Sequence, residues 1–314
     1  MTRATRNTRR RHTTRGFTLI ELMISLVIGV IVLSTALSYA MGTLRVVDGN
    51  NIRDEVNRNA RFIAMSLDRD LMSTGVGIES STSFGSLNVY GDTLVSLSVP
   101  YAPNESTPHV IYPPAGVNNP LNPGGTCGTY CIDFLEDAGA FDIEVGDLAR
   151  LQVNSTRHLL RVTGVSDMGG YRSVTYTNAT TLLQYPAGLS GGLLLDRFST
   201  FAQELTPVMY YIRGDSLMRA TSLNLDGTPA GEVLAYGVQS WNVDLIFMDG
   251  DIAANANDGD ADVTNDYDDI MAVRIQATLA ADHPDPRVMQ GTLFTRQYEW
   301  RFSPRNLMYE RNRL

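Results

Sequence analysis

The 314-residue sequence lacks lysine, and it contains only two cysteines and four histidines. All 25 basic residues are therefore arginine, a bias for which we have no functional explanation. Two cysteines exclude a disulfide-rich scaffold and a four-cysteine metal site. The histidines stand apart from one another, and the sequence contains neither a zinc-protease HExxH pair nor a phosphate-binding P-loop. These absences leave few routes to catalysis.

One short segment does match a catalytic pattern. Residues 188–192 satisfy the G-x-S-x-G pattern around Ser190, which in α/β hydrolases places a nucleophilic serine between a strand and a helix. The surrounding sequence shows no alternation of strand and helix patterns, and Pro186 precedes the segment. A glycine-rich loop is the better interpretation, with a membrane-anchored hydrolase as the alternative. We expect a protein that is not an enzyme.

Charge is distributed unevenly along the chain. The formal net charge is −9 at pH 7, and the first sixteen residues hold six arginines and no acidic residue. Removing that +6 from −9 leaves −15 on the rest of the chain. Because an acidic body repels phosphate backbones, we expect no nucleic-acid partner.

A single long hydrophobic run follows the basic leader. The 23 residues from Leu22 to Leu44 carry no formal charge and consist mainly of Leu, Ile, Val, Met and Ala. At about 1.5 Å per residue, a helix of this length crosses a bilayer core of roughly 30 Å. The run has no small-residue cleavage site at its far end, so it departs from the ordinary secretory signal.

The segment Gly16-Phe17-Thr18-Leu19-Ile20-Glu21 leads into this run. This segment resembles the leader-peptidase site of type IV pilins and their secretion-system relatives. It implies a leader of residues 1–16, cleavage between Gly16 and Phe17 by the prepilin peptidase, N-methylation of Phe17 and retention of Glu21. An ordinary single-pass anchor is the alternative, and it leaves the spacing of glycine, aromatic residue and acid unexplained.

Glu21 places a carboxylate inside the apolar segment. Such a group costs roughly 2.5 kcal/mol or more at the centre of a membrane-spanning helix, so it needs a partner. The resemblance implies that this partner is the α-amine of Phe17 in a neighbouring subunit. A buried pair of this kind would set the axial register of helices packed in a filament core.

The helical pattern continues beyond the hydrophobic run. Apolar residues recur at steps of three or four, which indicates an amphipathic helix. They are Ile52, Val56, Ala60, Ile63, Leu67 and Leu71. We therefore predict one helix from Phe17 to about Ser73, ended by Gly75 and Gly77. Residues 17–47 form its transmembrane or filament-core part, residues 48–77 its amphipathic part, and residues 78–314 a globular β-rich body.

Beyond residue 80 the sequence changes to short runs of strand-forming residues separated by turns. The predicted strands are 93–99, 148–153, 159–165, 171–176, 208–212, 217–220, 233–238, 241–247, 271–279 and 294–302. The predicted fold class is α+β, with an antiparallel sheet wrapped around the amphipathic half of the helix. Seven prolines between residues 100 and 130 predict an irregular surface segment there.

The C-terminal half contains, in this order, residues 234–245, a long acidic loop, residues 271–279 and Arg305-Asn306-Leu307. This arrangement resembles PilW-type minor pilins. It implies a minor pilin at or near the tip of a type IV pilus, which initiates assembly with other minor and major pilins. A minor pseudopilin of a type II secretion system is the alternative. Both imply a single-pass protein of the bacterial inner membrane with a periplasmic body, before it enters a filament at the cell surface.

The acidic loop has the spacing of a calcium site. Oxygen-bearing side chains stand at positions 1, 3, 5, 7, 9 and 12 of a twelve-residue stretch, as in an EF-hand loop. They are Asp258, Asp260, Asp262, Thr264, Asp266 and Asp269. Val263 stands where an EF-hand has glycine, and Asp269 where it has glutamate, so a true EF-hand is not expected. A looser calcium loop and a solvated acidic insertion both stay open.

Both cysteines, Cys127 and Cys131, belong to the end of the proline-rich segment. An oxidising periplasm or cell surface favours a disulfide between them, which closes a short loop and adds modest stability. A metal site would need further ligands nearby in the sequence, and a redox motif has two intervening residues where this pair has three.

Overall fold

The structure, a computed structural model, describes residues 16–100, 109–112, 119–120, 131–135, 143–154, 156–178, 194–195, 199–256, 265–284 and 292–307. In these residues one long helix, α1 (Leu19–Leu71), precedes sixteen strands, and every pairing between strands is antiparallel. The α+β fold class predicted from the sequence is confirmed.

The strands form a ten-stranded main sheet, a four-stranded second sheet and a two-stranded pair. The main sheet contains β1 (Leu87–Tyr90), β2 (Thr93–Ser98), β3 (His109–Val110), β5 (Cys131–Leu135), β6 (Leu148–Val153), β7 (Thr156–Asp167), β8 (Tyr171–Asn178), β10 (Thr200–Arg213), β11 (Ser216–Leu223) and β12 (Pro229–Ala235). The second sheet contains β13 (Val238–Phe247), β14 (Ile252–Ala253), β15 (Ile270–Pro284) and β16 (Leu293–Phe302). The pair consists of β4 (Asn119–Pro120) and β9 (Leu194–Leu195).

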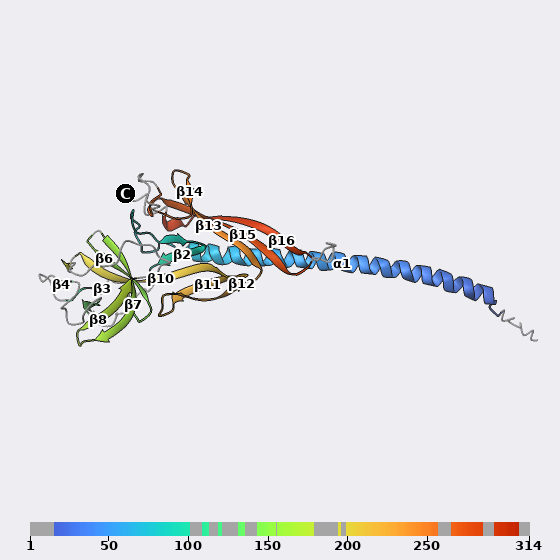
Figure 1. Cartoon of the computed structure of the whole chain (residues 1–314), viewed down its shortest axis with the longest axis horizontal. Coiled ribbons are helices and arrows are strands. Elements are labelled where there is room, and N and C mark those ends of the chain that lie inside the picture. The colour runs from blue at the N-terminus through green and yellow to red at the C-terminus, as the bar shows by residue number, and fades with distance from the viewer. Residues whose placement is uncertain are drawn as a thin grey trace, which may run out of the picture.

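The helix α1 has 53 residues and is therefore about 80 Å long. Its first half extends away from the body, and its second half lies against it (Figure 1). The chain leaves the helix through turns in which Gly75 and Gly77 have φ angles of +80° and +71°, a backbone region that glycine enters without steric cost. The predicted helix end near Ser73 is confirmed within two residues.

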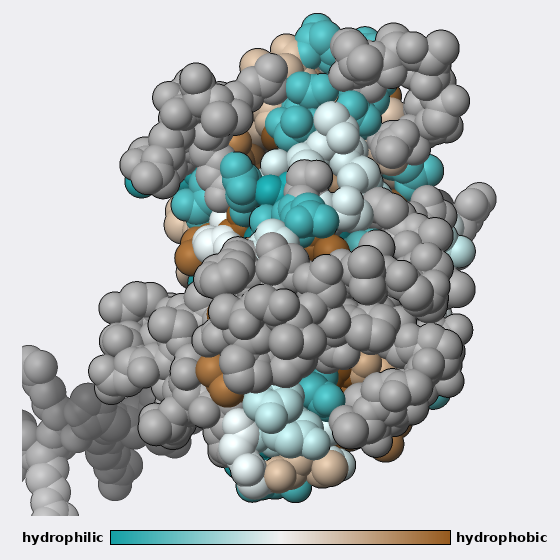
Figure 2. Space-filling view, turned by 90° about the vertical axis from the view of Figure 1, so that its left-hand side faces the viewer, coloured by the Kyte–Doolittle hydropathy of each residue, from teal (hydrophilic) through white to brown (hydrophobic). Residues whose placement is uncertain are grey.

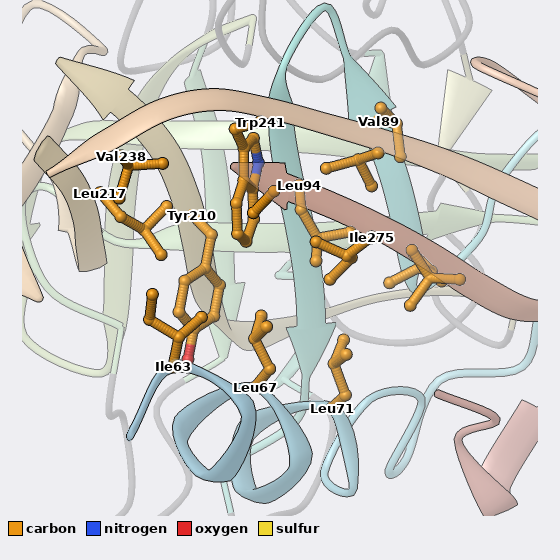
Figure 3. Close-up of a cluster of buried hydrophobic side chains, with 14 of the residues drawn as sticks. Ile63, Leu67, Leu71, Val89, Leu94, Tyr210, Leu217, Val238, Trp241 and Ile275 are labelled. Carbon is orange, nitrogen blue, oxygen red and sulfur yellow. The ribbon is translucent and has the colours of Figure 1, made fainter. Parts of the chain in front are cut away.

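The second half of α1 packs against the body through one apolar face. Ile63, Leu67 and Leu71 are at most 2% exposed, and Figure 3 shows all three pointing from the helix into the body. The labelled body residues around them come from both sheets and are Val89, Leu94, Tyr210, Leu217, Val238, Trp241 and Ile275. The periodic apolar stripe seen in the sequence is thus the surface that joins helix and sheets.

The long strand β10 connects two parts of the main sheet. Its second half, from Thr206, pairs with β2 and β11 close to α1, whereas Thr200–Leu205 pairs with β6. We call β3, β5, β6, β7, β8 and residues 200–205 the distal lobe. This lobe has its own apolar core, which includes Phe134, Leu151 and Val162. Figure 1 shows it beyond the C-terminal end of α1.

The sequence predicted one sheet wrapped around the helix, and the number of sheets in that prediction was wrong. The body has two larger sheets, and only part of it covers α1, because β10 continues past the helix end and pairs with β6 there. The prediction of an irregular segment at residues 100–130 also needs correction, since β3 and β4 lie within it. Both are two-residue strands, and Pro120 is tolerated because a short edge strand does not need every backbone N–H.

Candidate processing and assembly site

The predicted cleavage site lies directly in front of α1. Gly16 and Phe17 precede the helix without regular structure, and both are exposed, Phe17 by 83%. Thr18 has extended backbone angles and is the N-cap residue. The peptide bond between Gly16 and Phe17 is therefore accessible to a peptidase that binds its substrate in an extended conformation.

Glu21 and Thr18 form a reciprocal capping box. The Glu21 N–H donates to Thr18 Oγ1 at 3.3 Å, and the Thr18 N–H donates to Glu21 Oε2 at 3.0 Å. The Thr18 hydroxyl also donates to Glu21 Oε2 at 3.1 Å. These bonds satisfy backbone groups that the first helical turn leaves without partners. They also hold the carboxylate at the backbone N–H of Thr18, the residue that follows Phe17.

Thr18 is a site residue that sequence reasoning overlooked. Its signal was present in the sequence, because a threonine followed three residues later by glutamate, just before an apolar run, is the spacing of a capping box. The motif had been interpreted only through its glycine, aromatic residue and acid. Thr18 orients the carboxylate of Glu21, the predicted assembly residue.

In the described residues, nothing covers the first half of the helix behind this site. The large apolar side chains from Leu19 to Val47 are 47–80% exposed. Within the part of the chain that the structure describes, α1 is the one helix long and apolar enough to cross a membrane. Exposed apolar surface of this size requires lipid or other helices, because water solvates it poorly.

A buried ionic cluster holds the far end of α1 to the body. Asp70 Oδ2 accepts hydrogen bonds from the Tyr210 hydroxyl at 2.5 Å and from Arg219 Nε at 2.6 Å, and Arg69 Nε donates to Oδ1 at 3.2 Å. Burial by itself raises the pKa of Asp70, but the bonds from Arg219 and Tyr210 outweigh it and hold that pKa below its ordinary value. Burial and the Asp70 carboxylate raise the pKa of Tyr210.

The acidic loop lies only partly within the described residues. Asp258, Asp260, Asp262 and Thr264 are outside them. Asp266 and Asp269 are described, and together with Asp268 they present carboxylate oxygens that all lie within 4.8 Å of one another. Asp268 was not in the predicted ligand set. Carboxylate oxygens are the ligands that calcium prefers, so calcium binding stays a prediction.

The cysteines and the serine motif are likewise only partly described. Cys131 begins β5 and is disulfide-bonded, whereas Cys127, its predicted partner, lies outside the described residues. Cys131 Sγ lies 3.2 Å from Ser173 Oγ. Ser190, of the G-x-S-x-G segment, is also outside the described residues.

Comparison with known proteins agrees with this site. A family model described as the prokaryotic N-terminal methylation motif matches residues 11–37, which include Gly16, Phe17, Glu21 and the first part of α1. No curated protein and no solved structure matches the chain. The match supports a type IV pilin-like signal, which implies processing by a prepilin peptidase and a pilin-like or pseudopilin-type protein. This points to a structural protein, anchored by one helix in the inner membrane before assembly.

Proposed function

We propose that this chain is a minor pilin of a type IV pilus that is incorporated at or near the tip and helps to initiate assembly with other pilins. The observation that carries the proposal is the methylation motif on an exposed cleavage site followed by an uncovered apolar helix. A helix of this kind is held by lipid before assembly and by neighbouring helices afterwards. The PilW-type resemblance of the C-terminal half supports the minor-pilin assignment.

The position of the distal lobe supports a place at the tip. Subunits joined through parallel α1 helices stack along the filament, so earlier subunits lie farther from the membrane. The distal lobe extends past the C-terminal end of α1 (Figure 1), into space that an earlier subunit would otherwise occupy. Figure 2 views this end of the molecule, where the described surface mixes hydrophilic and hydrophobic residues. Such a surface suits contact with water at the end of a filament.

The pilin assignment is tested by the N-terminus of the protein from its native host. Intact-mass and N-terminal analysis, with and without the prepilin peptidase, should give a mature chain that begins with N-methylated Phe17 only when the peptidase is present. A chain that keeps residues 1–16 in both strains would identify an ordinary single-pass anchor instead.

The tip position is tested on sheared filaments. An epitope tag in the turn between β10 and β11, at Gly214-Asp215, should be labelled by gold at one end of each filament. Gly214 has a φ angle of +67° in this two-residue turn and no atom within 4 Å of an added Cβ, so the turn offers room for an insertion. Labels spread along the filament would overturn the tip position.

The second candidate is a minor pseudopilin of a type II secretion system, since the same motif and anchor serve that assembly. Deletion of the gene separates the two. Loss of surface filaments and twitching motility supports the pilus, whereas loss of exoprotein secretion with normal filaments supports the pseudopilin.

A further inference from the structure

The strand β16 is a long, regular edge of the second sheet. Among the described residues it pairs only with β15, on one side. The register runs without interruption from Val273 opposite Phe302 to Ala280 opposite Thr295. An edge strand presents backbone N–H and C=O groups that can pair with another chain. β16 thus offers a template for an additional strand.

The other edges in the described residues are short, irregular or covered. β12 begins with Pro229 and shows two register shifts against β11, and β14 has two residues. β1 has four residues. The edge of β5 is covered by residues 111–112, because the Tyr112 N–H donates to Asp133 O at 2.9 Å and Ile111 bridges Phe134. Proteins usually protect free edges in these ways. β16 has ten residues, and its pairing with β15 has one register shift, near its start, and is regular from Thr295 to Phe302.

The charged side chains of β16 are already engaged within the chain. Arg296 Nη1 donates to Asn57 Oδ1 at 2.9 Å, and Arg301 Nε donates to Glu299 Oε1 at 3.0 Å. Gln276 Nε2 donates to Glu299 Oε2 at 3.0 Å. These charges are held on the faces of the sheet by their partners. Among the described residues, no strand pairs with the outer backbone of β16.

The aromatic side chains of β16 are only partly covered. They form a row on the face of the strand toward α1 and are Phe294, Tyr298, Trp300 and Phe302, all of intermediate exposure. Tyr298 and Trp300 stack with ring centroids 5.7 Å apart, and the Arg53 guanidinium lies over the Phe294 ring. A neighbouring strand would remove more of this aromatic surface from water.

Contacts with α1 show which way β16 runs. Phe294, near its start, contacts Arg53, and Tyr298 donates to Asn57 Oδ1 at 2.8 Å. After the strand, the Asn306 side chain donates to Met72 O at the end of the helix. β16 therefore runs in the same direction as α1, away from the membrane, and starts beside the end of the exposed apolar segment. Figure 1 shows β15 and β16 lying along the helix.

This direction excludes a symmetric pairing of two copies. Because β15 occupies one edge of β16, a two-fold symmetric pair that is hydrogen-bonded through the free edges is antiparallel, about an axis perpendicular to the sheet. Their α1 helices would then point in opposite directions, which chains anchored in one membrane in one orientation cannot do. Pairing with the β12 edge of a second copy is disfavoured by Pro229 and the register shifts.

We propose that the free edge of β16 binds an extended strand of a different pilin-class subunit anchored in the same membrane. This inference rests on the proposed function, since side-by-side anchor helices bring the neighbouring body next to the start of β16. Backbone hydrogen bonds supply the binding, and the aromatic row selects the side chains that the partner presents.

The test uses the full chain in its native host, with a photo-crosslinking benzoylphenylalanine at Gln297 of β16. The matched control carries the probe at Glu232 of β12, which is also an exposed edge residue. The Gln297 probe should give a cross-link that mass spectrometry maps to a strand of another protein with its own N-terminal methylation motif. The Glu232 probe should not. Gln297→Pro should lower the amount of this partner recovered with the chain by about tenfold, as expected from the loss of one or two interstrand hydrogen bonds.

Cross-links from Gln297 to a second copy, to a helix, or to no pilin-class chain would overturn the inference. Cleavage at Gly16 and presence in filaments are measured in the same cells. If both are normal while the strand cross-link is missing, β16 pairing fails and the proposed function stands. If the chain is not cleaved, both fail. The cross-linking result does not depend on the proline variant, which can also weaken the pairing to β15.

Discussion

Asp70 links the end of α1 to two strands that follow it by about 140 residues in sequence. Its carboxylate lies in a site where the side chain is 7% exposed and accepts bonds from an arginine and a tyrosine. Breaking such a pair leaves a buried charge and a buried hydroxyl without their partner. The residue therefore holds the amphipathic half of the helix in place.

Replacing Asp70 with Asn should lower the free energy of unfolding by about 2–4 kcal/mol, because Arg219 loses its charged partner in a buried site. The pKa of Asp70 is lowered in the folded state from an ordinary value of 3.8. Its contribution is therefore present above about pH 4 and is lost as the pH falls through the lowered pKa. Urea unfolding of both proteins at pH 7 and pH 3 measures this, and the difference should shrink at pH 3. The exposed Asp68→Asn variant is the control and should change little.

Glu21 provides a second prediction for a single residue, and it lies in the first half of α1, away from the folded body. Glu21→Ala should leave a chain that is cleaved at Gly16 and held in the membrane but enters filaments poorly, because it lacks the carboxylate that we predict to set the register with a neighbouring subunit. Immunoblots of sheared filaments and of membranes compare the two pools. Glu55→Ala, on the exposed side of the amphipathic half, is the control. Normal incorporation of Glu21→Ala would contradict the pairing with a neighbouring amine.

At the scale of elements, α1 is one continuous helix whose two halves have different surroundings. Its first half is uncovered, and its second half has one buried face and one exposed face. Leu67 is fully buried, whereas Met65, two residues earlier, is 73% exposed. Both positions lie in the same helix but differ in burial. Comparing alanine substitutions at the two positions therefore distinguishes the effect of packing from the effect of helix propensity.

Leu67→Ala should destabilise the protein by about 2–5 kcal/mol, the usual cost of a cavity in a core. Met65→Ala should cost less than about 1 kcal/mol, since an exposed side chain buries little surface. Urea unfolding in detergent solution, followed by the fluorescence of Trp241 and Trp300, compares the two variants. Equal losses would mean that Leu67 does not lie in the core.

The acidic loop before β15 provides a second prediction at this scale. Calcium should raise the melting temperature of the protein, because an ion that binds only the folded state stabilises it by about 2.7 kcal/mol at a concentration 100 times its Kd. Asp266→Asn together with Asp269→Asn should remove this rise, and the exposed Asp249→Asn should keep it. Thermal scans with calcium, magnesium or a chelator measure it. An unchanged melting temperature would favour a solvated acidic insertion.

At the scale of the whole molecule, the distal lobe limits where the chain fits in a filament. If the lobe blocks the addition of a subunit ahead of it, each filament accepts the chain only at its leading end. Raised expression should then give more and shorter filaments, while the number of copies per filament stays constant. Quantitative mass spectrometry of sheared filaments, together with length measurements by electron microscopy, tests this. A rise in copies per filament would contradict it.

The sequence by itself predicted the type IV pilin-like signal and both limits of α1. These signals are local: Gly16, Phe17 and Glu21 form the motif through their spacing, and Ile63, Leu67 and Leu71 mark the helix through its period. Ten of the strands were predicted at least in part, whereas β1, β3, β4, β5, β9 and β14 were missed, because each has at most five residues and carries little periodic signal.

The tertiary structure alone decided the two sheets, the distal lobe, the Asp70 cluster and the free edge of β16. Asp70 and Arg219 are 149 residues apart in sequence, and no local pattern pairs them. The extent of β10 is likewise set by partners on either side of it, β2 and β11 near the helix and β6 beyond it. Strand pairing depends on hydrogen bonds between distant segments, so periodicity predicts that a strand exists and leaves open which strand lies beside it.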